Sequence, residues 1–189
     1  METIRTFMAI ELPQPVRQVL GEVSQKLAAQ VAKGGVRWVQ PDRIHLTVRF
    51  LGDTAVSQLP TIAANLDAAM QRHAAFSLRL ARVGCFPNAR RPRVIWVGLE
   101  GDVAALLKLK KDVDGALRPL GWEVEERPFQ AHLTLGRVQD AHKLAGLTWD
   151  VNVARLVVPV TAVKLIESQL RPSGPIYTIR HEAALGKTT

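Results

Sequence analysis

The sequence predicts an α+β fold with two pseudo-symmetric lobes, each an antiparallel sheet with helices packed outside, facing each other across a central cleft. Segments with helical spacing of apolar residues alternate with shorter β-rich segments along the 189 residues. The order helix, short Trp-containing segment, proline and His-containing strand occurs at residues 15–51 and again at 102–137. We therefore expect an internal duplication within a single two-lobed domain over residues 1–189, a length that buries a substantial core.

Helices are predicted where apolar residues recur every three or four positions. In the first of them, Val16, Leu20 and Val23 mark the buried face, and Pro15 suits an early helical position. Glycines at positions 34 and 35 follow this segment and end it. The predicted helices span residues 15–32, 56–72 and 102–118, and residues 139–146 are weakly helical.

Strands are predicted where β-branched and aromatic residues are bounded by proline or glycine. Residues 76–85 alternate between apolar and polar, whereas residues 93–99 form the apolar run of a buried strand. The short segment at Trp122 resembles residues 36–39 and indicates another strand. The predicted strands span residues 3–12, 36–39, 44–52, 76–85, 93–99, 122–124, 131–137, 153–170 and 175–182, with a turn of Pro172, Ser173 and Gly174 between the last two.

The most informative feature is a motif of His, apolar residue, Thr and apolar residue, which starts at His45 and again at His132. Alternate residues of a strand point to the same face, so each copy presents an imidazole and the hydroxyl of Thr47 or Thr134 on one side. Histidine titrates near neutral pH, and a hydroxyl can hydrogen-bond a phosphate oxygen. Two such strands provide the groups that proton transfer on both sides of a phosphate requires.

Arginines near the two motifs are further candidates for phosphate binding. Regular alternation places Arg49 on the same face as Thr47. Arg137 reaches the face of Thr134 only if its strand bends near Gly136. Carboxylates and cysteines do not cluster at metal-ligand spacing, so neither a metal nor another cofactor is expected. A metal site built from the two histidines and carboxylates from elsewhere in the chain is the alternative.

The formal net charge of +8 favours a polyanionic partner such as RNA, although a high arginine content can also reflect genome composition. The loop with Arg90, Arg91 and Arg93 either follows a phosphate backbone or is an ordinary solvated loop. Cys85, the single cysteine, lies in an apolar segment and is expected to pack in the core without a disulfide. We find neither a membrane-spanning run nor a signal peptide, and expect a cytoplasmic monomer without a membrane partner.

The paired motifs resemble those of the two-histidine (2H) phosphoesterase superfamily, and within it those of the RNA 2′,3′-cyclic phosphodiesterases, also called 2′-5′ RNA ligases. The flanking segments that carry the resemblance are Arg5–Pro13, Val36–Val39 leading to Pro41, Ser168, and Gly174–Tyr177. It implies hydrolysis of an RNA terminal 2′,3′-cyclic phosphate to a 2′-phosphomonoester by metal-independent acid-base catalysis. His45 is then the proton donor to the leaving 3′ oxygen, and His132 is the proton acceptor that activates water.

The same site can serve a related reaction, which is ligation of tRNA halves through a 2′-5′ bond or cleavage of such a bond. A basic RNA-binding module without catalysis is a further alternative, but it has no use for two matched histidines. The expected substrate-binding residues are Thr47, Thr134, Arg137 and Phe7. Phe7 either stacks on the terminal base or packs in the core, and the same two possibilities hold for Trp38 and Tyr177 as cleft residues.

Overall fold

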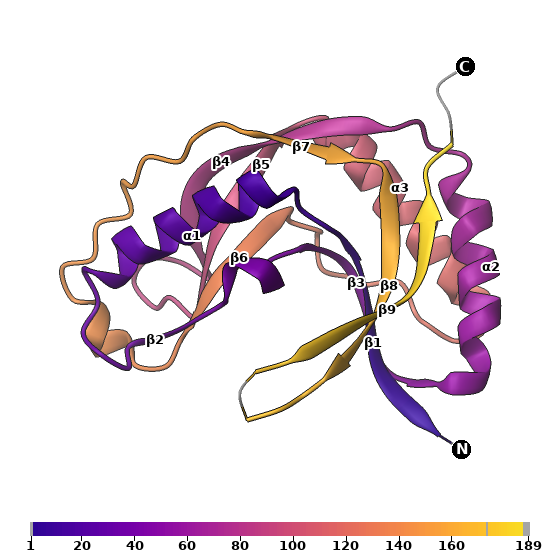
Figure 1. The fold of residues 1–189 in the computed structure, drawn as a ribbon, viewed down its shortest axis with the longest axis horizontal. Helices are drawn as coiled ribbons and strands as arrows, with labels where there is room; N and C mark the ends of the chain where they lie inside the picture. The colour runs from indigo at the N-terminus through magenta and orange to yellow at the C-terminus, as the bar shows by residue number, and fades with distance from the viewer. Residues whose placement is uncertain (1, 173, 187–189) are drawn as a thin grey trace.

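The computed structural model describes residues 2–172 and 174–186. Strands in these ranges form one sheet with the order β7-β4-β5-β6-β3-β1-β8-β9, and β2 pairs with β6 (Figure 1). The strands are β1 (Thr3–Ile10), β2 (Val36–Trp38), β3 (Leu46–Ala55), β4 (Phe76–Phe86), β5 (Val94–Gly101), β6 (His132–Val138), β7 (Val157–Val160), β8 (Ala162–Gln169) and β9 (Ile176–Ala184). The α-helices are α1 (Gln14–Ala28), α2 (Leu59–Met70) and α3 (Val103–Leu117), and the 3-10 helices are η1 (Pro41–Arg43), η2 (Val56–Gln58), η3 (Arg118–Leu120) and η4 (Ala141–Leu144).

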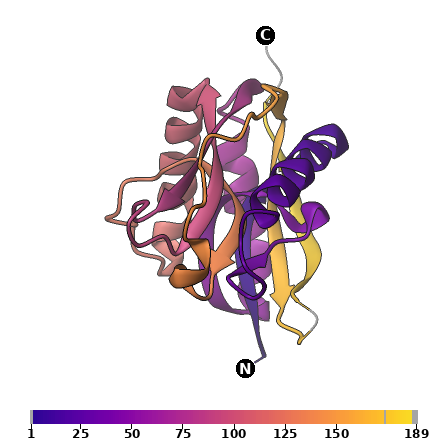
Figure 2. The same ribbon diagram turned by 90° about the vertical axis from the view of Figure 1, so that its left-hand side faces the viewer.

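The sheet is strongly curled and divides into two lobes between β3 and β6, the strands that carry the motifs. These neighbours are antiparallel and share one register pair, Leu46 opposite Leu133. Strands β6, β5, β4 and β7 form one lobe and β3, β1, β8 and β9 form the other, as Figure 2 shows from the side. The α+β class and the antiparallel lobes are confirmed, and the structure adds that the two lobes are halves of one continuous sheet.

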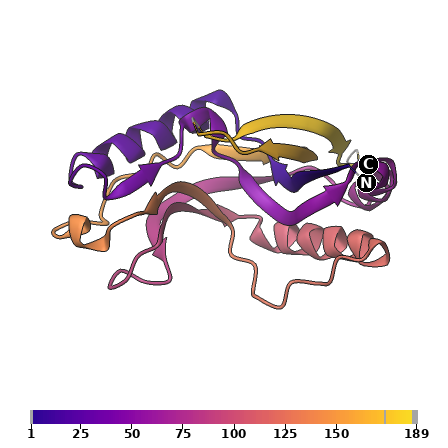
Figure 3. The same ribbon diagram turned by 90° about the horizontal axis from the view of Figure 1, so that it is seen from below.

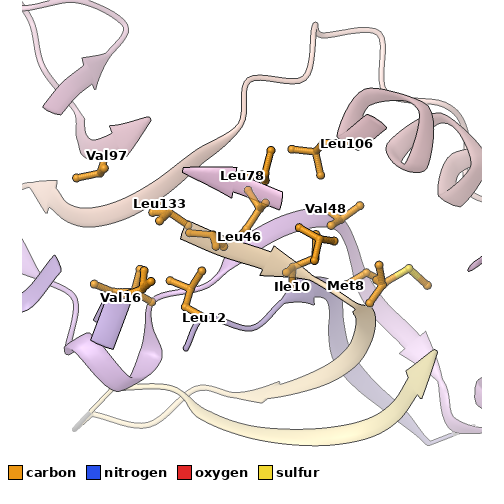
Figure 4. Packing of buried hydrophobic residues seen from close by; sticks show 14 of the residues in the cluster. Met8, Ile10, Leu12, Val16, Leu46, Val48, Leu78, Val97, Leu106 and Leu133 are labelled. Atoms are coloured by element: carbon orange, nitrogen blue, oxygen red, sulfur yellow. The ribbon is translucent and has the colours of Figure 1, made fainter. Parts of the chain in front are cut away.

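The helices cross between the lobes. Helix α1 precedes β3 in the chain but contacts β6, whereas α3 precedes β6 but contacts β3. The two helices lie at opposite ends of the molecule (Figure 3). Helix α2 packs against α3 and covers β8 and β9. Because of this exchange, buried residues of both lobes belong to a single core cluster, in which Val16, Leu46 and Leu133 lie together (Figure 4).

Two predicted strands differ from the structure. Residues 153–170 are divided, because β7 pairs with β4 at one end of the sheet while β8 pairs with β1 in the other lobe. Residues 122–124 form no strand. The indole Nε1 of Trp122 instead donates a hydrogen bond of 3.0 Å to the carbonyl oxygen of Leu51, so a side chain attaches this segment to β3.

The other elements lie where the apolar patterns predict them, with ends that differ by a few residues. The segment at 139–146 contains the short helix η4. Residues 56–58 of the second predicted helix form η2, so α2 itself starts at Leu59. Ser173 of the predicted turn lies outside the described residues. Among the described residues, no helix has both the length and the apolar character that crossing a membrane requires.

Candidate active site

The four motif side chains come together around the Leu46–Leu133 pair. His45 lies directly before β3 and His132 is the first residue of β6. In an antiparallel pair, the residues on either side of a register pair face one another, which places His45 next to Thr134 and Thr47 next to His132. Both leucines are fully buried, so the polar side chains occupy the opposite face, where each is partly exposed.

Both imidazoles are held by the same type of hydrogen bond. Nδ1 of His45 lies 2.9 Å from the carbonyl oxygen of Arg43, and Nδ1 of His132 lies 2.7 Å from that of Gln130. A carbonyl oxygen only accepts, so Nδ1 is the protonated nitrogen of each ring. Nε2 is therefore the nitrogen of each histidine that is available to accept or donate a proton.

Aromatic rings surround both histidines. The ring of Phe7 is stacked on His45 at 4.7 Å between centroids, and Tyr177 contacts His45 edge-on at 5.4 Å. Phe86 contacts His132 edge-on at 4.9 Å. Burial is the largest cause that lowers the pKa of His45 to about 4, because removal from water disfavours the imidazolium.

Phe7 supports His45 and is not open to a base. Its side chain is 3% exposed and belongs to a small apolar cluster with Ala9 and Ile166, against which Tyr177 packs. This corrects the expectation that Phe7 stacks on the terminal base of a substrate. Tyr177 both contacts His45 and packs against this apolar cluster.

A β-bulge in β6 brings Arg137 to the face of the motif. Trp96 pairs with Thr134 and the neighbouring Ile95 pairs with Gly136, so Leu135 is an extra residue. Leu135 and Gly136 are both buried, and Arg137 then points outward like Thr134. A Cβ atom on Gly136 would lie 2.6 Å from Val36 Cγ1, which explains why glycine stands there. The bend that the Arg137 prediction requires is thus present.

A matching bulge in β3 has the opposite consequence for Arg49. Ala9 pairs with Thr47 and the neighbouring Met8 pairs with Arg49, so Val48 is the extra residue. Arg49 is therefore turned to the core and is 6% exposed, which corrects the expectation that it shares the face of Thr47. Regular alternation failed because the bulge at Val48 turns the residues that directly follow it to the opposite face.

Arg49 instead joins a buried ionic cluster between β3 and α3. Its Nη1 lies 3.5 Å from Asp114 Oδ1 and 3.4 Å from Glu125 Oε2, and its Nη2 donates a hydrogen bond to the carbonyl oxygen of Glu123. Nζ of Lys110 contacts the same two carboxylates, at 2.6 Å and 3.1 Å. The cluster fixes the segment that leads to the second motif against the strand that carries the first.

Phe50 is a candidate site residue that sequence reasoning missed. It stands five residues after His45, as Arg137 stands five residues after His132, and both follow the bulge on the motif face. Its side chain is 56% exposed beside Phe7, with ring centroids 6.0 Å apart. The duplication itself was the signal that points to Phe50, because it makes the fifth residue after each histidine equivalent.

The remaining candidates from the sequence are the loop arginines, the single cysteine and a possible metal site. The loop arginines Arg91 and Arg93 line a hollow with Phe86, the ring that contacts His132. Burial raises the pKa of the Cys85 thiol, which favours its neutral form. Within residues 2–172 and 174–186, His, Cys, Asp and Glu side chains form no group of three or more that could hold a metal ion.

Known proteins show the same sequence pattern and fold. The family model described as LigT like Phosphoesterase matches residues 10–96 and again residues 97–177, so each match contains one motif. An RNA 2′,3′-cyclic phosphodiesterase of Thermotoga maritima is 33% identical over 181 residues, which are 95% of this chain and 94% of that protein. One of Methanocaldococcus jannaschii is 31% identical over 183 residues, which are 95% and 99% of the two chains.

Solved structures agree with these relatives. A crystal structure of a Thermus thermophilus protein superposes with a TM-score of 0.82 at 30% identity and covers 98% of this chain and 100% of its own. The structure of E. coli LigT complexed with NADP+ has a TM-score of 0.75 at 26% identity and covers 98% and 100%. With both halves matched and both motifs in place, this chain belongs to the family of LigT-like phosphoesterases.

Proposed function

We propose that the chain opens the 2′,3′-cyclic phosphate at the end of an RNA to a 2′-phosphomonoester, without a metal. The observation that carries the proposal is the pair of histidines, each fixed through Nδ1 to a backbone carbonyl oxygen on either side of one strand pair. The names of the Thermotoga and Methanocaldococcus relatives support the substrate. NADP+, present in the E. coli LigT complex, carries a ribose 2′-phosphate, the group that the product has.

The proposed reaction is an in-line displacement at phosphorus. Nε2 of His132 accepts a proton from water while the water oxygen bonds to phosphorus. The bond between phosphorus and the 3′ oxygen breaks, and His45 donates its proton to that oxygen. His132 ends protonated and His45 neutral, and exchange with solvent restores both. Thr47 and Thr134 donate hydrogen bonds to the non-bridging oxygens.

Two further residues complete the proposed substrate site. Arg137 is exposed on the motif face, where its guanidinium can form a charge-assisted fork with the phosphate. Phe50 offers an exposed ring at the equivalent position of the other lobe, a surface on which a base can stack.

The lowered pKa of His45 adds a condition to its role as the donor. With a pKa of about 4, this imidazole is neutral at pH 7 in the free protein. A phosphate anion close to the ring favours the imidazolium and raises the pKa. The donor role therefore requires that the bound substrate itself promotes protonation of His45, so that the imidazolium forms in the complex with substrate.

The same displacement with a 5′-hydroxyl in place of water joins two RNA ends, such as tRNA halves, through a 2′-5′ bond. We keep this reaction as the alternative for the same residues.

Because the helices cross between the lobes and both motifs lie in one chain, we infer that a single two-lobed domain acts as a monomer. We also infer a cytoplasmic location, since the single cysteine leaves no internal disulfide to form.

The test offers an oligoribonucleotide with a 2′,3′-cyclic phosphate end to the protein in the presence of EDTA. We expect hydrolysis at an unchanged rate and a product that resists an enzyme specific for 3′-phosphates. Phosphorus NMR identifies the isomer independently. A 3′-phosphate product would mean that the 2′ oxygen leaves, and loss of activity in EDTA with recovery on addition of a divalent ion would contradict the metal-independent mechanism.

A further inference from the structure

A cavity of about 340 Å³ has His45 in its lining, whereas the other three motif residues are not part of that lining. Its walls come from the start of helix α1, from η1 and from the β8–β9 hairpin. Arg17 and Arg43 line it together with Ile176 and Tyr177, and the carboxylates of Glu11 and Asp42 also belong to the lining. The site therefore combines two guanidinium groups with an aromatic and an aliphatic side chain, which suits a ligand that carries both an anion and an apolar ring.

The charge of Arg17 is poorly compensated. Its closest carboxylate contact in the described chain is Nη2 to Glu11 Oε1 at 4.0 Å. Glu11 is itself engaged by Lys164, whose Nζ lies 2.5 Å from the other carboxylate oxygen. Nε of Arg17 is buried and has no hydrogen-bond partner among the described residues. An anion in the cavity would supply the charge-assisted partner that this guanidinium lacks.

Arg43 is placed by the hairpin. A Cβ atom on Gly174 would lie 2.2 Å from Nη1 of Arg43, so the guanidinium packs directly on the backbone there. Gly174 also has a φ of +110°, which residues with a side chain rarely adopt. The contact with the hairpin keeps the second positive charge at the wall of the cavity.

Tyr177 connects the cavity with the cleft. Its ring contacts His45 at 5.4 Å. Burial raises the pKa of its hydroxyl, and the positive charges of Arg43 in the cavity and Arg137 in the cleft both act in the opposite direction. Because Tyr177 lines the cavity and also contacts His45, an extended ligand held between the histidines can continue past Tyr177 into the cavity.

We propose that this cavity binds the nucleotide that precedes the cyclic end of the RNA, with Arg17 and Arg43 on the internucleotide phosphate. Sugar and base then lie against Ile176 and Tyr177, and Asp42 at the wall can accept a hydrogen bond from a ribose hydroxyl. The proposal rests on the proposed function and adds to it a binding site for the nucleotide that precedes the cyclic end.

The test compares kcat/KM for adenosine 2′,3′-cyclic phosphate with that for the dinucleotide ApA ending in a 2′,3′-cyclic phosphate. We expect the wild type to prefer the dinucleotide and Arg17→Gln to reduce this preference about tenfold, since a hydrogen bond to a charged group is lost. Arg17→Lys keeps the charge and is expected to retain part of the preference. Arg72→Gln, a matched change at an exposed residue after helix α2, is expected to leave it as it is.

A second substrate isolates the charge of the internucleotide phosphate. A dinucleotide with an uncharged methylphosphonate linkage is expected to lose the wild-type preference, and Arg17→Gln is then expected to have no further effect on it. If Arg17→Gln lowered kcat/KM by the same factor for mononucleotide and dinucleotide, or lowered neither, the ratio would be unchanged and the proposal would be overturned. If the wild type opened neither substrate, the proposed function itself would be wrong.

Discussion

The imidazole of His45 lies stacked on the phenyl ring of Phe7, with ring centroids 4.7 Å apart and ring planes inclined by 28°. The edge of Tyr177 closes a second side of the same imidazole. This apolar surrounding destabilises the charged form of one proposed catalytic histidine in the free protein. It should therefore affect both the pKa of His45 and the pH dependence of the free energy of unfolding.

We expect His45 to titrate near pH 4 in the free protein and at clearly higher pH when a phosphate is bound. Proton NMR of the imidazole signals, with and without adenosine 2′-monophosphate, measures both values, and His45→Asn assigns the signal. The same shift should separate the rate profiles, because kcat/KM reports the free enzyme and kcat reports the complex. A pKa near 6.5 that phosphate leaves unchanged would refute the proposed coupling.

The lowered pKa also makes stability depend on pH in a defined direction. Between its unfolded pKa of 6.5 and its folded pKa of about 4, His45 takes up a proton only in the unfolded state. The free energy of unfolding therefore falls as the pH drops through this range, by at most about 3 kcal/mol, and His45 contributes no pH dependence above it. Urea unfolding at pH 7 and pH 4 should show this loss in the wild type and a smaller one in His45→Asn.

Arg49→Ala is expected to destabilise the fold by about 1–3 kcal/mol, because Asp114 then keeps only Lys110 as a cation and the carbonyl oxygen of Glu123 loses its donor. Asp114 is 8% exposed as a side chain and depends on Arg49 and Lys110 for compensation. The matched control is Arg155→Ala, which removes an exposed pair with Glu100 and should cost less than about 1 kcal/mol. Equal effects of the two changes in urea unfolding would show that the buried cluster contributes nothing particular.

Thr47→Val and Thr134→Val should each reduce transition-state stabilisation by roughly 1–3 kcal/mol, since the change keeps the shape and removes the hydroxyl. The reduction should be seen in kcat/KM for a cyclic phosphate, with little change in stability because both side chains are partly exposed. Full activity in both variants would mean that other groups hold the phosphate.

The sequence predicts the motif side chains well because their placement depends on strand alternation over three residues. It fails for Arg49 because the bulge at Val48 lies between that residue and Thr47. The bulge at Leu135 is the reason that Arg137 shares the motif face, and Gly136 beside it is the sequence signal that a bend is possible there. The bulge at Val48 has no such glycine beside it and becomes visible only when the strand is paired in the sheet.

The crossing of the helices and the burial of Phe7 have the same origin. The spacing of apolar residues in helix α1 shows which face is buried but not that β6 of the other lobe covers it. Phe7 shares its strand pattern with core residues, and the rings of His45 and Tyr177 that cover it come from distant parts of the chain. Such contacts follow from the register of the sheet and cannot be obtained from local periodicity.

The central claim is that two histidines transfer the two protons, and its most direct test is the rate of cyclic phosphate opening by His45→Ala and His132→Ala with EDTA present. Each variant should lose roughly 10²–10⁴-fold in kcat, because each removes one general acid-base group. Circular dichroism should show that both variants keep the fold. Wild-type rates in either folded variant would contradict the two-histidine mechanism.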